Sequence, residues 1–352
     1  MIIDRKLALA DTFIDLYAGV GQVTQSFRFT LMNGATNQQL GEIHPIRTAT
    51  LTHDTTRTIK RQLRLALGVT DAADINPASD RVDVTMTVAG VDYPLGRYVF
   101  TDYPRQDFLN GQLAAAAMTD EMIIIDQQVT SGISGRNRLV NVVIQEVLAP
   151  FDYTKVIAAT DGLFSIQNWG PGANRGQVLE ALALTGDMFS PWFDNNRVLR
   201  FIRSFNPADS VPNFDFDAGN AVNRDSIVHT DDTLTAPNQY VVISNAGPGT
   251  AAVTGTANIP DSAPHSIANR GFAVPEVLDL QANDTAQAVA MAQSLAITQT
   301  VAERVSLVTA LDPRHDSYDV VIWQGEKWLE LGWAMDLEAG GGMSHTMRKV
   351  YS

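Results

Sequence analysis

The 352-residue chain contains no cysteine, which excludes disulfide bonds, thiolate nucleophiles and zinc sites with sulfur ligands. Basic residues are also scarce, because 25 Lys and Arg stand against 39 Asp and Glu and leave a formal net charge of -14. This charge has the wrong sign for a protein that must hold phosphate backbones, so nucleic acid is a poor candidate ligand. Solubility alone accounts for the acidity, which by itself assigns no function.

Long apolar runs are missing as well. No segment reaches the ~18 uninterrupted apolar residues that cross a bilayer. Asp4, Arg5 and Lys6 precede a Leu-Ala stretch that is too short for the apolar core of a signal peptide. Hydrophobic residues nevertheless make up 45% of the chain, which is enough to build packed cores. A chain of this length normally divides its core, so we expect two or three compact units.

The first third of the chain reads as strands. Residues 26–31 alternate large and polar side chains, and Asn33-Gly34 then supplies a pair that favours a tight turn. Residues 81–88 and 93–100 alternate again on either side of a turn-forming segment, which predicts a second hairpin.

Two neighbouring segments give weaker signals. Residues 55–67 carry Ile59, Leu63 and Leu67 at four-residue spacing but start with β-prone residues, so helix and strand both stay open. Residues 110–125 read as β-like and end in a short buried run.

The small residues at 131–135 indicate a domain boundary, after which the pattern changes. Residues 137–149 place their apolar side chains on one face and stop at Pro150, which predicts an amphipathic helix. Asn174 is a suitable N-cap for a second helix that ends near Gly186. Segments 189–193 and 197–202 flank an Asp-Asn-Asn turn, so this middle unit is mixed α and β.

From residue 205 onward, strands and loops return. One helix is predicted at 284–299, a segment rich in Ala, Gln, Leu and Met without Gly or Pro. The final segments, 305–311, 319–323, 327–337 and 345–350, read as a β-meander. Seven prolines disfavour a long helix in this region: Pro207, Pro212, Pro237, Pro248, Pro260, Pro264 and Pro275.

Two clusters of His and Asp could bind a divalent ion, but neither has the spacing of a known metal motif. Both lie in segments where Asp commonly caps backbone amides, so we interpret them as turns and expect no metal ligands. The clusters are His229, Asp231 and Asp232, and Asp312, His315, Asp316 and Asp319.

Catalytic motifs are equally weak. There is no Gly-x-Ser-x-Gly elbow, and carboxylate pairs for glycan hydrolysis leave no spacing signature, so a hydrolase stays an open alternative. Trp323, Trp328 and Trp333 recur every five residues, which in a strand places successive rings on opposite faces. This arrangement favours core or interface positions over a carbohydrate-binding platform.

The chain as a whole, from about residue 55, resembles the tail-hub proteins of long-tailed and contractile phages. These proteins are also called baseplate hub or tail-associated minor tail proteins. Each motif is degenerate, and their order along the chain carries the resemblance. One departure is Asn195-Asn196, where the family usually has Asp-Gly. The similar segments are 80–81 with 93–100 (PLG-x-Y-x-F), 192–200 (WFDNNRVLR), 238–242 (NQYVV), 312–321 (DP and then DVV), and Trp333 with 341–350.

The resemblance implies a β-rich α+β fold. It implies two β-barrel-like tail-tube (hub) domains, at 1–130 and within 206–352, with an α/β domain inserted at 131–205. The second β region would include the helix at about 284–299. It also implies a homotrimer whose six barrels stack on a tail-tube hexamer or a distal tail protein and match its symmetry.

The implied role is structural: a virion protein of the tail tip, assembled in the cytoplasm of the bacterial host, that serves DNA ejection and host cell entry. Further implied partners are the tape-measure protein and tail fibre or receptor-binding proteins, with DNA only in transit through the lumen. We expect no catalytic residues, no cofactor and no metal. Because the sequence ends after the last hub strands, we expect receptor binding or peptidoglycan cleavage to reside on other proteins. The alternatives are a tail-associated cell-wall or glycan hydrolase and a carbohydrate-binding receptor module.

Overall fold

The computed structural model describes residues 24–47, 49–68, 75–103, 105–108, 111–160, 164–165, 167–218, 222–232, 234–244, 252–280, 282, 284–298 and 302–351. Residues 1–10, for which the sequence predicts no signal peptide, lie outside these ranges. Among the described residues, no helix has both the length and the apolar character needed to cross a membrane.

Strands outnumber helices along the described chain. The strands are β1 Gln25–Asn33, β2 Gln39–Ile43, β3 Ala49–Asp54, β4 Arg61–Leu67, β5 Asp80–Val88, β6 Val91–Asp102, β7 Arg105–Phe108, β8 Gly111–Asp120, β9 Ile133–Ser134, β10 Arg138–Leu139, β11 Lys155–Ile157, β12 Phe164–Ser165, β13 Asn168–Trp169, β14 Trp192–Phe193, β15 Leu199–Phe201, β16 Phe214–Asp215, β17 Val222–Asp231, β18 Gln239–Ser244, β19 Val253–Asn258, β20 Pro275–Asp279, β21 Glu303–Ala310, β22 Val320–Trp323, β23 Glu326–Leu337 and β24 Gly342–Lys349. The helices are α3 Met122–Ile125, α4 Val140–Val147, α5 Arg175–Thr185, the 3-10 turn η1 Pro207–Asp209, α6 Ile267–Arg270 and α7 Thr285–Thr298.

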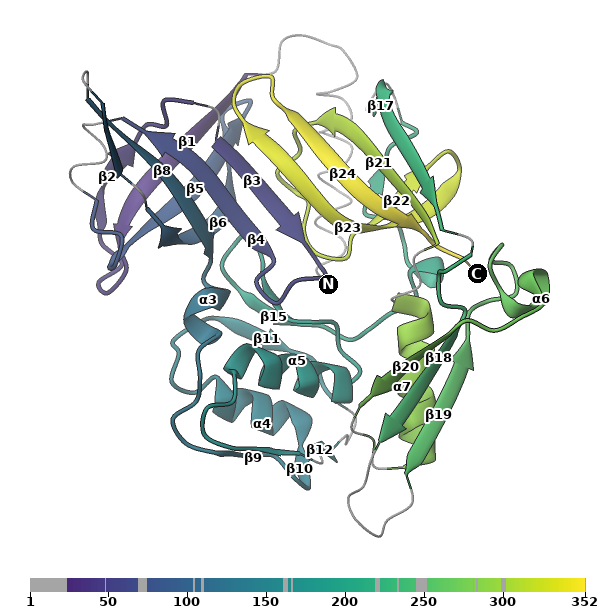
Figure 1. Ribbon diagram of the computed structural model, residues 1–352. Coiled ribbons are helices and arrows are strands. Elements are labelled where there is room, and N and C mark those ends of the chain that lie inside the picture. The colour runs from purple at the N-terminus through teal and green to yellow at the C-terminus, as the bar shows by residue number, and fades with distance from the viewer. Residues whose placement is uncertain are drawn as a thin grey trace.

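One large sheet joins strands from the two ends of the chain. Its 14 described strands run in the order β17-β21-β24-β23-β3-β4-β8-β6-β5-β1-β2, with β22 and β16 branching from β23 and β7 from β8. The two halves meet where β23 pairs antiparallel with β3, which sets Trp333 opposite His53 and Met335 opposite Leu51. Figure 1 shows this sheet across the top of the molecule, with the N-terminal strands on the left and the C-terminal strands on the right.

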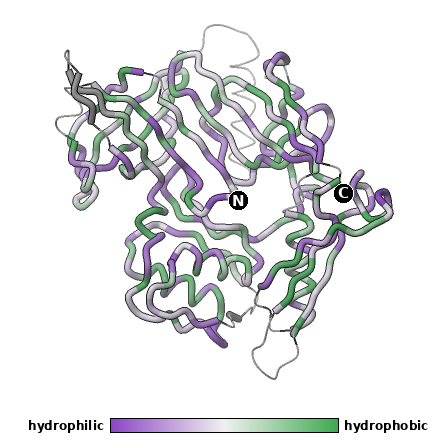
Figure 2. The backbone as a smooth tube through the Cα atoms, viewed as in Figure 1, coloured by the Kyte–Doolittle hydropathy of each residue, from purple (hydrophilic) through white to green (hydrophobic). Residues whose placement is uncertain are grey.

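Alternating side chains give each half of the sheet its own core. Burial alternates along β5, where Val82, Val84 and Met86 point inward against the buried leucines of β3 and β4. A second cluster in the C-terminal half contains Trp323 and Trp328. Figure 2 shows the alternation of hydrophobic and hydrophilic residues along these strands. Each fully buried aliphatic side chain contributes about 1.5–3 kcal/mol, so these two clusters hold the β units together.

The middle unit contains the predicted helices and hairpin. α4 and α5 pack together through Val143, Ile144 and Leu179, and the Asn174 side chain caps α5 by accepting from the Gln177 amide at 3.1 Å. β14 and β15 form the predicted hairpin around Asp194-Asn195-Asn196. The left-handed residue of its turn is Arg197, with a φ of 63°.

A smaller α/β layer lies beneath the C-terminal half of the large sheet (Figure 1). β18 pairs with β19 and β20, and α7 covers this three-stranded sheet, which confirms the helix predicted at 284–299. Gly255 on β19 permits the close approach, because a Cβ there would lie 2.2 Å from the backbone of Ala288 and Val289. A side chain at this position would therefore push α7 away from the sheet.

Two details correct the sequence interpretation, and one settles a segment that was left open. The ambiguous segment 55–67 ends in a strand, β4. The run Met122–Ile125 is a short helix rather than β-like, and the Asp120 carboxylate before it accepts from the Met122 amide at 3.0 Å. The final strands are not a simple meander, since β21 pairs with β24 and β22 pairs with β23.

The β-rich character with few helices agrees with the fold class expected from the sequence. The barrel-like form of the two β units and the proposed domain boundaries stay predictions.

Candidate functional site

The turn between β21 and β22, residues 312–319, lies where the three parts of the chain meet. The Asp312 carboxylate accepts from the backbone amide of Arg314 at 3.0 Å, and Asp319 accepts from the amide of Asp316 at 2.7 Å. These bonds confirm that aspartates of this cluster cap a turn. We call residues 312–319 the junction turn.

Arg61, the first residue of β4, connects the junction turn to the middle unit. Its guanidinium donates to Asp316 Oδ1 at 2.9 Å and to Asn195 Oδ1 at 2.6 Å, and the Asp316 oxygen also accepts from Trp192 Nε1 at 2.9 Å. The Asn195 amide in turn donates to the carbonyls of Pro313 and His315. Two of the motifs that carry the family resemblance, 192–200 and 312–321, therefore contact each other directly.

His53 on β3 adds a second connection to the junction turn. Its Nε2 lies 2.7 Å from Ser317 Oγ, and its ring stacks on Trp333 at 5.1 Å between centroids. Burial and the nearby charges of Arg61 and Lys60 hold the pKa of His53 well below its usual value, so the ring is neutral. A Ser-His pair needs a third group to orient the base, but within the described structure His53 Nδ1 has no hydrogen-bond partner. The pair therefore packs two elements together and does not form a catalytic triad.

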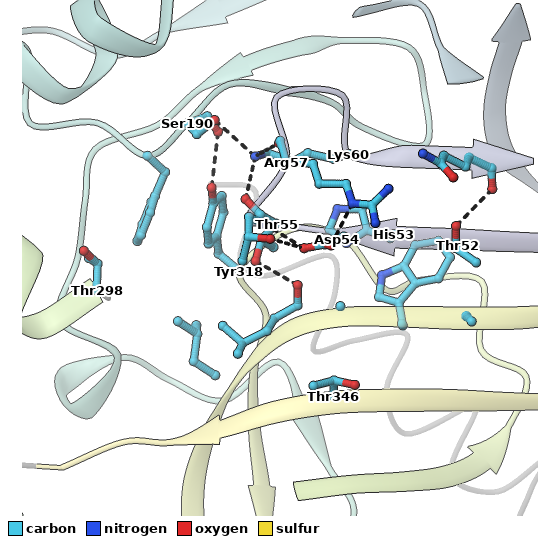
Figure 3. A pocket seen from close by; sticks show the side chains of 18 of the residues that line it. Thr52, His53, Asp54, Thr55, Arg57, Lys60, Ser190, Thr298, Tyr318 and Thr346 are labelled. Carbon is cyan, nitrogen blue, oxygen red and sulfur yellow. Dashed lines mark hydrogen bonds and ion pairs between the residues drawn. The ribbon is translucent and has the colours of Figure 1, made fainter. Parts of the chain in front are cut away.

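A groove of about 1100 Å³ opens beside His53 and the junction turn. It lies between the large sheet on one side and the middle unit and α7 on the other. Figure 3 shows its lining, to which β3 contributes Thr52, β24 contributes Thr346 and α7 contributes Thr298. Lys60 crosses one wall and donates to the Thr55 carbonyl at 2.8 Å and to Ser190 Oγ at 3.1 Å. Burial lowers the pKa of Lys60 to about 8.

Two carboxylates line the groove, those of Asp54 and Glu180. Burial alone would raise the pKa of Asp54, but hydrogen bonds from Thr56 and the charge of Arg57 outweigh burial and lower it. A general acid for glycan hydrolysis needs the opposite shift, so Asp54 is unsuited to that role.

The remaining residues of the two predicted His and Asp clusters lie in different parts of the structure. Asp232 caps a turn by accepting from the Thr235 amide at 2.9 Å, and the His229 ring lies 5.4 Å from that of Trp323. His315 faces Glu330 and His345 instead of the carboxylates of its own turn, so a buried group of three possible metal ligands forms.

Sequence reasoning missed Glu330 and His345. The available signal was Glu330 itself, because a carboxylate at a core-facing position of a strand requires a partner. His315 Nδ1 lies 2.8 Å from Glu330 Oε2, and His345 Nδ1 lies 2.6 Å from Glu330 Oε1. Burial alone would raise the pKa of Glu330, but the two histidines lower it to about 2. The carboxylate is therefore ionised.

The three tryptophans confirm their predicted core position. Trp323 and Trp328 contact each other edge to face at 5.6 Å in the C-terminal cluster, and Trp333 is buried in the N-terminal one. No carbohydrate-stacking platform is formed by these three rings.

No family model matches this sequence, and a search of curated proteins finds no significant match. Solved structures do match. The 43 kDa tail protein of prophage MuSo2 from Shewanella oneidensis superposes with a TM-score of 0.61 at 12% identity, covering 92% of this chain and 98% of that one. A tail protein from Neisseria meningitidis MC58 gives 0.57 at 12% identity, covering 92% and 97%. Prophage tail protein gp18 from Listeria monocytogenes EGD-e gives 0.58 at 8% identity, covering 92% and 95%.

These superpositions extend over nearly the whole of each chain, so the fold is that of a phage tail protein. This fold agrees with the resemblance to phage tail proteins that the motif order indicated.

Proposed function

We propose that this chain is a virion structural protein that forms the trimeric hub at the distal end of a phage-like tail tube. The two β units, residues 1–130 and the tube-type part of 206–352, would be the hub domains, with 131–205 inserted between them. Three chains would then present six similar β units to a six-fold tube ring and adapt it to a three-fold tip. The role is mechanical and needs no catalytic residue.

The observation that carries the proposal is the continuous sheet through β3 and β23. This pairing fixes the two β units side by side within one chain, as neighbouring units around a ring would have to be. The sheet path ends at β17 on one side and β2 on the other, and both strands are largely exposed. Exposed edge strands promote aggregation unless another element covers them. A ring in which β17 of one chain meets β2 of the next would cover both edges.

The junction turn supports the same role, because a hub under load needs rigid connections between its parts. Arg61, Asn195 and Asp316 join three separate segments through hydrogen bonds that are largely shielded from water. Largely buried hydrogen-bond networks of this kind favour one arrangement of the packed elements.

The acidic composition fits a channel that DNA crosses only in transit. A net charge of -14 gives the assembled ring little affinity for phosphates, so a genome could slide through without being held. The expected partners are a distal tail protein or tail-tube hexamer, the tape-measure protein, and fibre or receptor-binding proteins at the tail tip of the virion.

Mass photometry of the purified chain, alone and mixed with its tail-tube protein, tests the proposal. We expect a species of about 115 kDa, three times the 38.2 kDa chain, either alone or on the tube ring. A chain that stays monomeric with the tube protein and hydrolyses peptidoglycan would contradict the proposal and favour the hydrolase alternative. Monomers that bind glycans without assembling would favour a receptor module.

A further inference from the structure

We propose that His315, Glu330 and His345 form a binding site for one divalent metal ion of the zinc class in the core of the C-terminal β unit. The inference goes beyond the hub function, and it departs from the expectation that the chain binds no metal. It rests on the position of the three side chains and on the groups that orient them.

The three ligand atoms converge from three different elements. His315 lies in the junction turn, Glu330 on β23 and His345 on β24, and one ligand atom of each lies within 4.8 Å of the other two. All three residues are at most 1% exposed. The two histidine Nδ1 atoms approach different oxygens of the same carboxylate, so an ion between them would meet two nitrogens and a carboxylate.

Neighbouring side chains fix the orientation of both imidazole rings. Phe214 stacks on His315 at 3.8 Å between centroids with an interplanar angle of 10°. Thr309 Oγ1 lies 2.8 Å from His345 Nε2 and also 2.8 Å from the Ala310 carbonyl, to which it donates. In the tautomer in which His345 Nε2 donates to this hydroxyl, the Nδ1 lone pair faces Glu330. Metal-binding histidines are commonly held this way, with the second ring nitrogen donating to a fixed acceptor.

The same geometry can hold a cation. In that tautomer the His345 Nδ1 lone pair lies 2.6 Å from a Glu330 carboxylate oxygen, and a proton or a metal ion shared between them would contact both. The surroundings of the histidine rings are aromatic, with Phe216 5.0 Å from His345, so water is a poor source of compensation. One divalent ion balances the carboxylate and uses both nitrogen lone pairs.

The donor set favours a transition metal of the zinc class over Mg²⁺ and Ca²⁺. Two imidazoles and one carboxylate suit Zn²⁺, whereas Mg²⁺ and Ca²⁺ prefer oxygen ligands. Because the ligands come from the junction turn, β23 and β24, the ion would tie the turn to the sheet. Its contribution would be structural.

Metal analysis of the full chain tests the proposal. The chain is unfolded in chelator, refolded with or without Zn²⁺, dialysed, and measured by inductively coupled plasma mass spectrometry. We expect about one zinc per chain and a higher melting temperature with zinc. Co²⁺ in place of Zn²⁺ should give a visible absorption band from nitrogen and oxygen ligands. Folded wild-type chain that retains no zinc and gives no such band overturns the proposal and leaves a proton-linked His-Glu-His triad.

Matched variants locate the ion. Glu330→Gln and His345→Gln should lose the bound zinc, whereas His229→Gln, which alters an exposed histidine outside the cluster, should keep it. Thr309→Val keeps all three ligands and should weaken zinc binding about 10-fold or more, as loss of such an orienting group does. Zinc retained at full stoichiometry in folded Glu330→Gln would overturn the assignment. If the ligand variants do not fold, the wild-type Co²⁺ spectrum and Thr309→Val still decide the question.

Discussion

Replacing Arg61 with methionine should destabilise the connection between the β sheet and the middle unit more than almost any surface change. The Arg61 side chain is 2% exposed, and it donates to both Asn195 and Asp316. Methionine has a similar length and can keep the packing near Trp333, whose ring lies 5.7 Å from the guanidinium carbon. The substitution therefore removes the charge and its donors with little loss of volume.

The magnitude follows from what the substitution leaves behind. Removing one partner of a buried ion pair costs about 3–5 kcal/mol, because the other charge stays buried without compensation. Asp316 is 20% exposed and keeps two donors, Trp192 Nε1 and the Ser317 amide, which places it at the low end of this range. The Asn195 side-chain oxygen also loses its donor, which lowers the free energy of unfolding by about 1 kcal/mol. We expect a total of about 3–4 kcal/mol from these principles.

Urea unfolding followed by tryptophan fluorescence measures this loss, since Trp333 lies beside Arg61 and Trp192 donates to its partner Asp316. Arg28→Met is the matched control, because Arg28 pairs with Asp92 at 2.9 Å with both side chains about half exposed, and such pairs contribute about 0–1 kcal/mol. Adding Asp316→Asn to Arg61→Met should cost less than the sum of the single changes. An Arg61→Met loss no larger than that of Arg28→Met would refute the reasoning.

Three further predictions concern pH, packing and assembly. Burial raises the pKa of Asp120 from 3.8 to about 6, so between these pH values the folded chain binds more protons than the unfolded chain. The contribution of Asp120 to the free energy of unfolding should therefore fall by about 3 kcal/mol as pH rises through this window. Asp120→Asn should flatten this pH dependence in urea titrations at several pH values, and an unchanged slope would count against the assignment. Gly255→Ala should lower the free energy of unfolding by about 3 kcal/mol, because the new side chain pushes α7 away from β19. Gly41→Ala should lower it by less than about 1 kcal/mol, because a Cβ there meets nothing within 4 Å, and thermal unfolding of both variants measures the difference. Val228→Lys, at an exposed position of β17, should reduce the fraction of trimers in mass photometry. Val211→Lys, equally exposed but outside the sheet edges, should leave that fraction unchanged. Equal behaviour of the two variants would exclude β17 as a subunit contact.

Local features of the fold could be predicted where nearby residues determine them. Asn174 caps α5 because its side chain reaches an amide three residues ahead. The β5–β6 hairpin forms around Ala89-Gly90, where both residues take positive φ values of 49° and 81°. Apolar periodicity likewise indicated α4, and a composition rich in helix-forming residues without Gly or Pro indicated α7. In each of these cases the residues that determine the structure lie within a few positions of one another along the sequence.

Long-range contacts could not be predicted in this way. The pairing of β3 with β23 matches Ala49 to Leu337, and no local pattern specifies a register between segments so far apart. The same applies to the site: the sequence placed His315 in a turn, but only the β23–β24 pairing brings Glu330 and His345 to it. The short helix α3 was missed because its three isoleucines have high β propensity.

The most direct test of the hub proposal is a cryo-electron microscopy map of the assembled tail tip. We expect three copies of this chain around a central channel, six similar β units facing the tube, and β17 of each chain next to β2 of its neighbour. A map with a single copy beside the tube, or with the chain off the axis and both sheet edges uncovered, would contradict it.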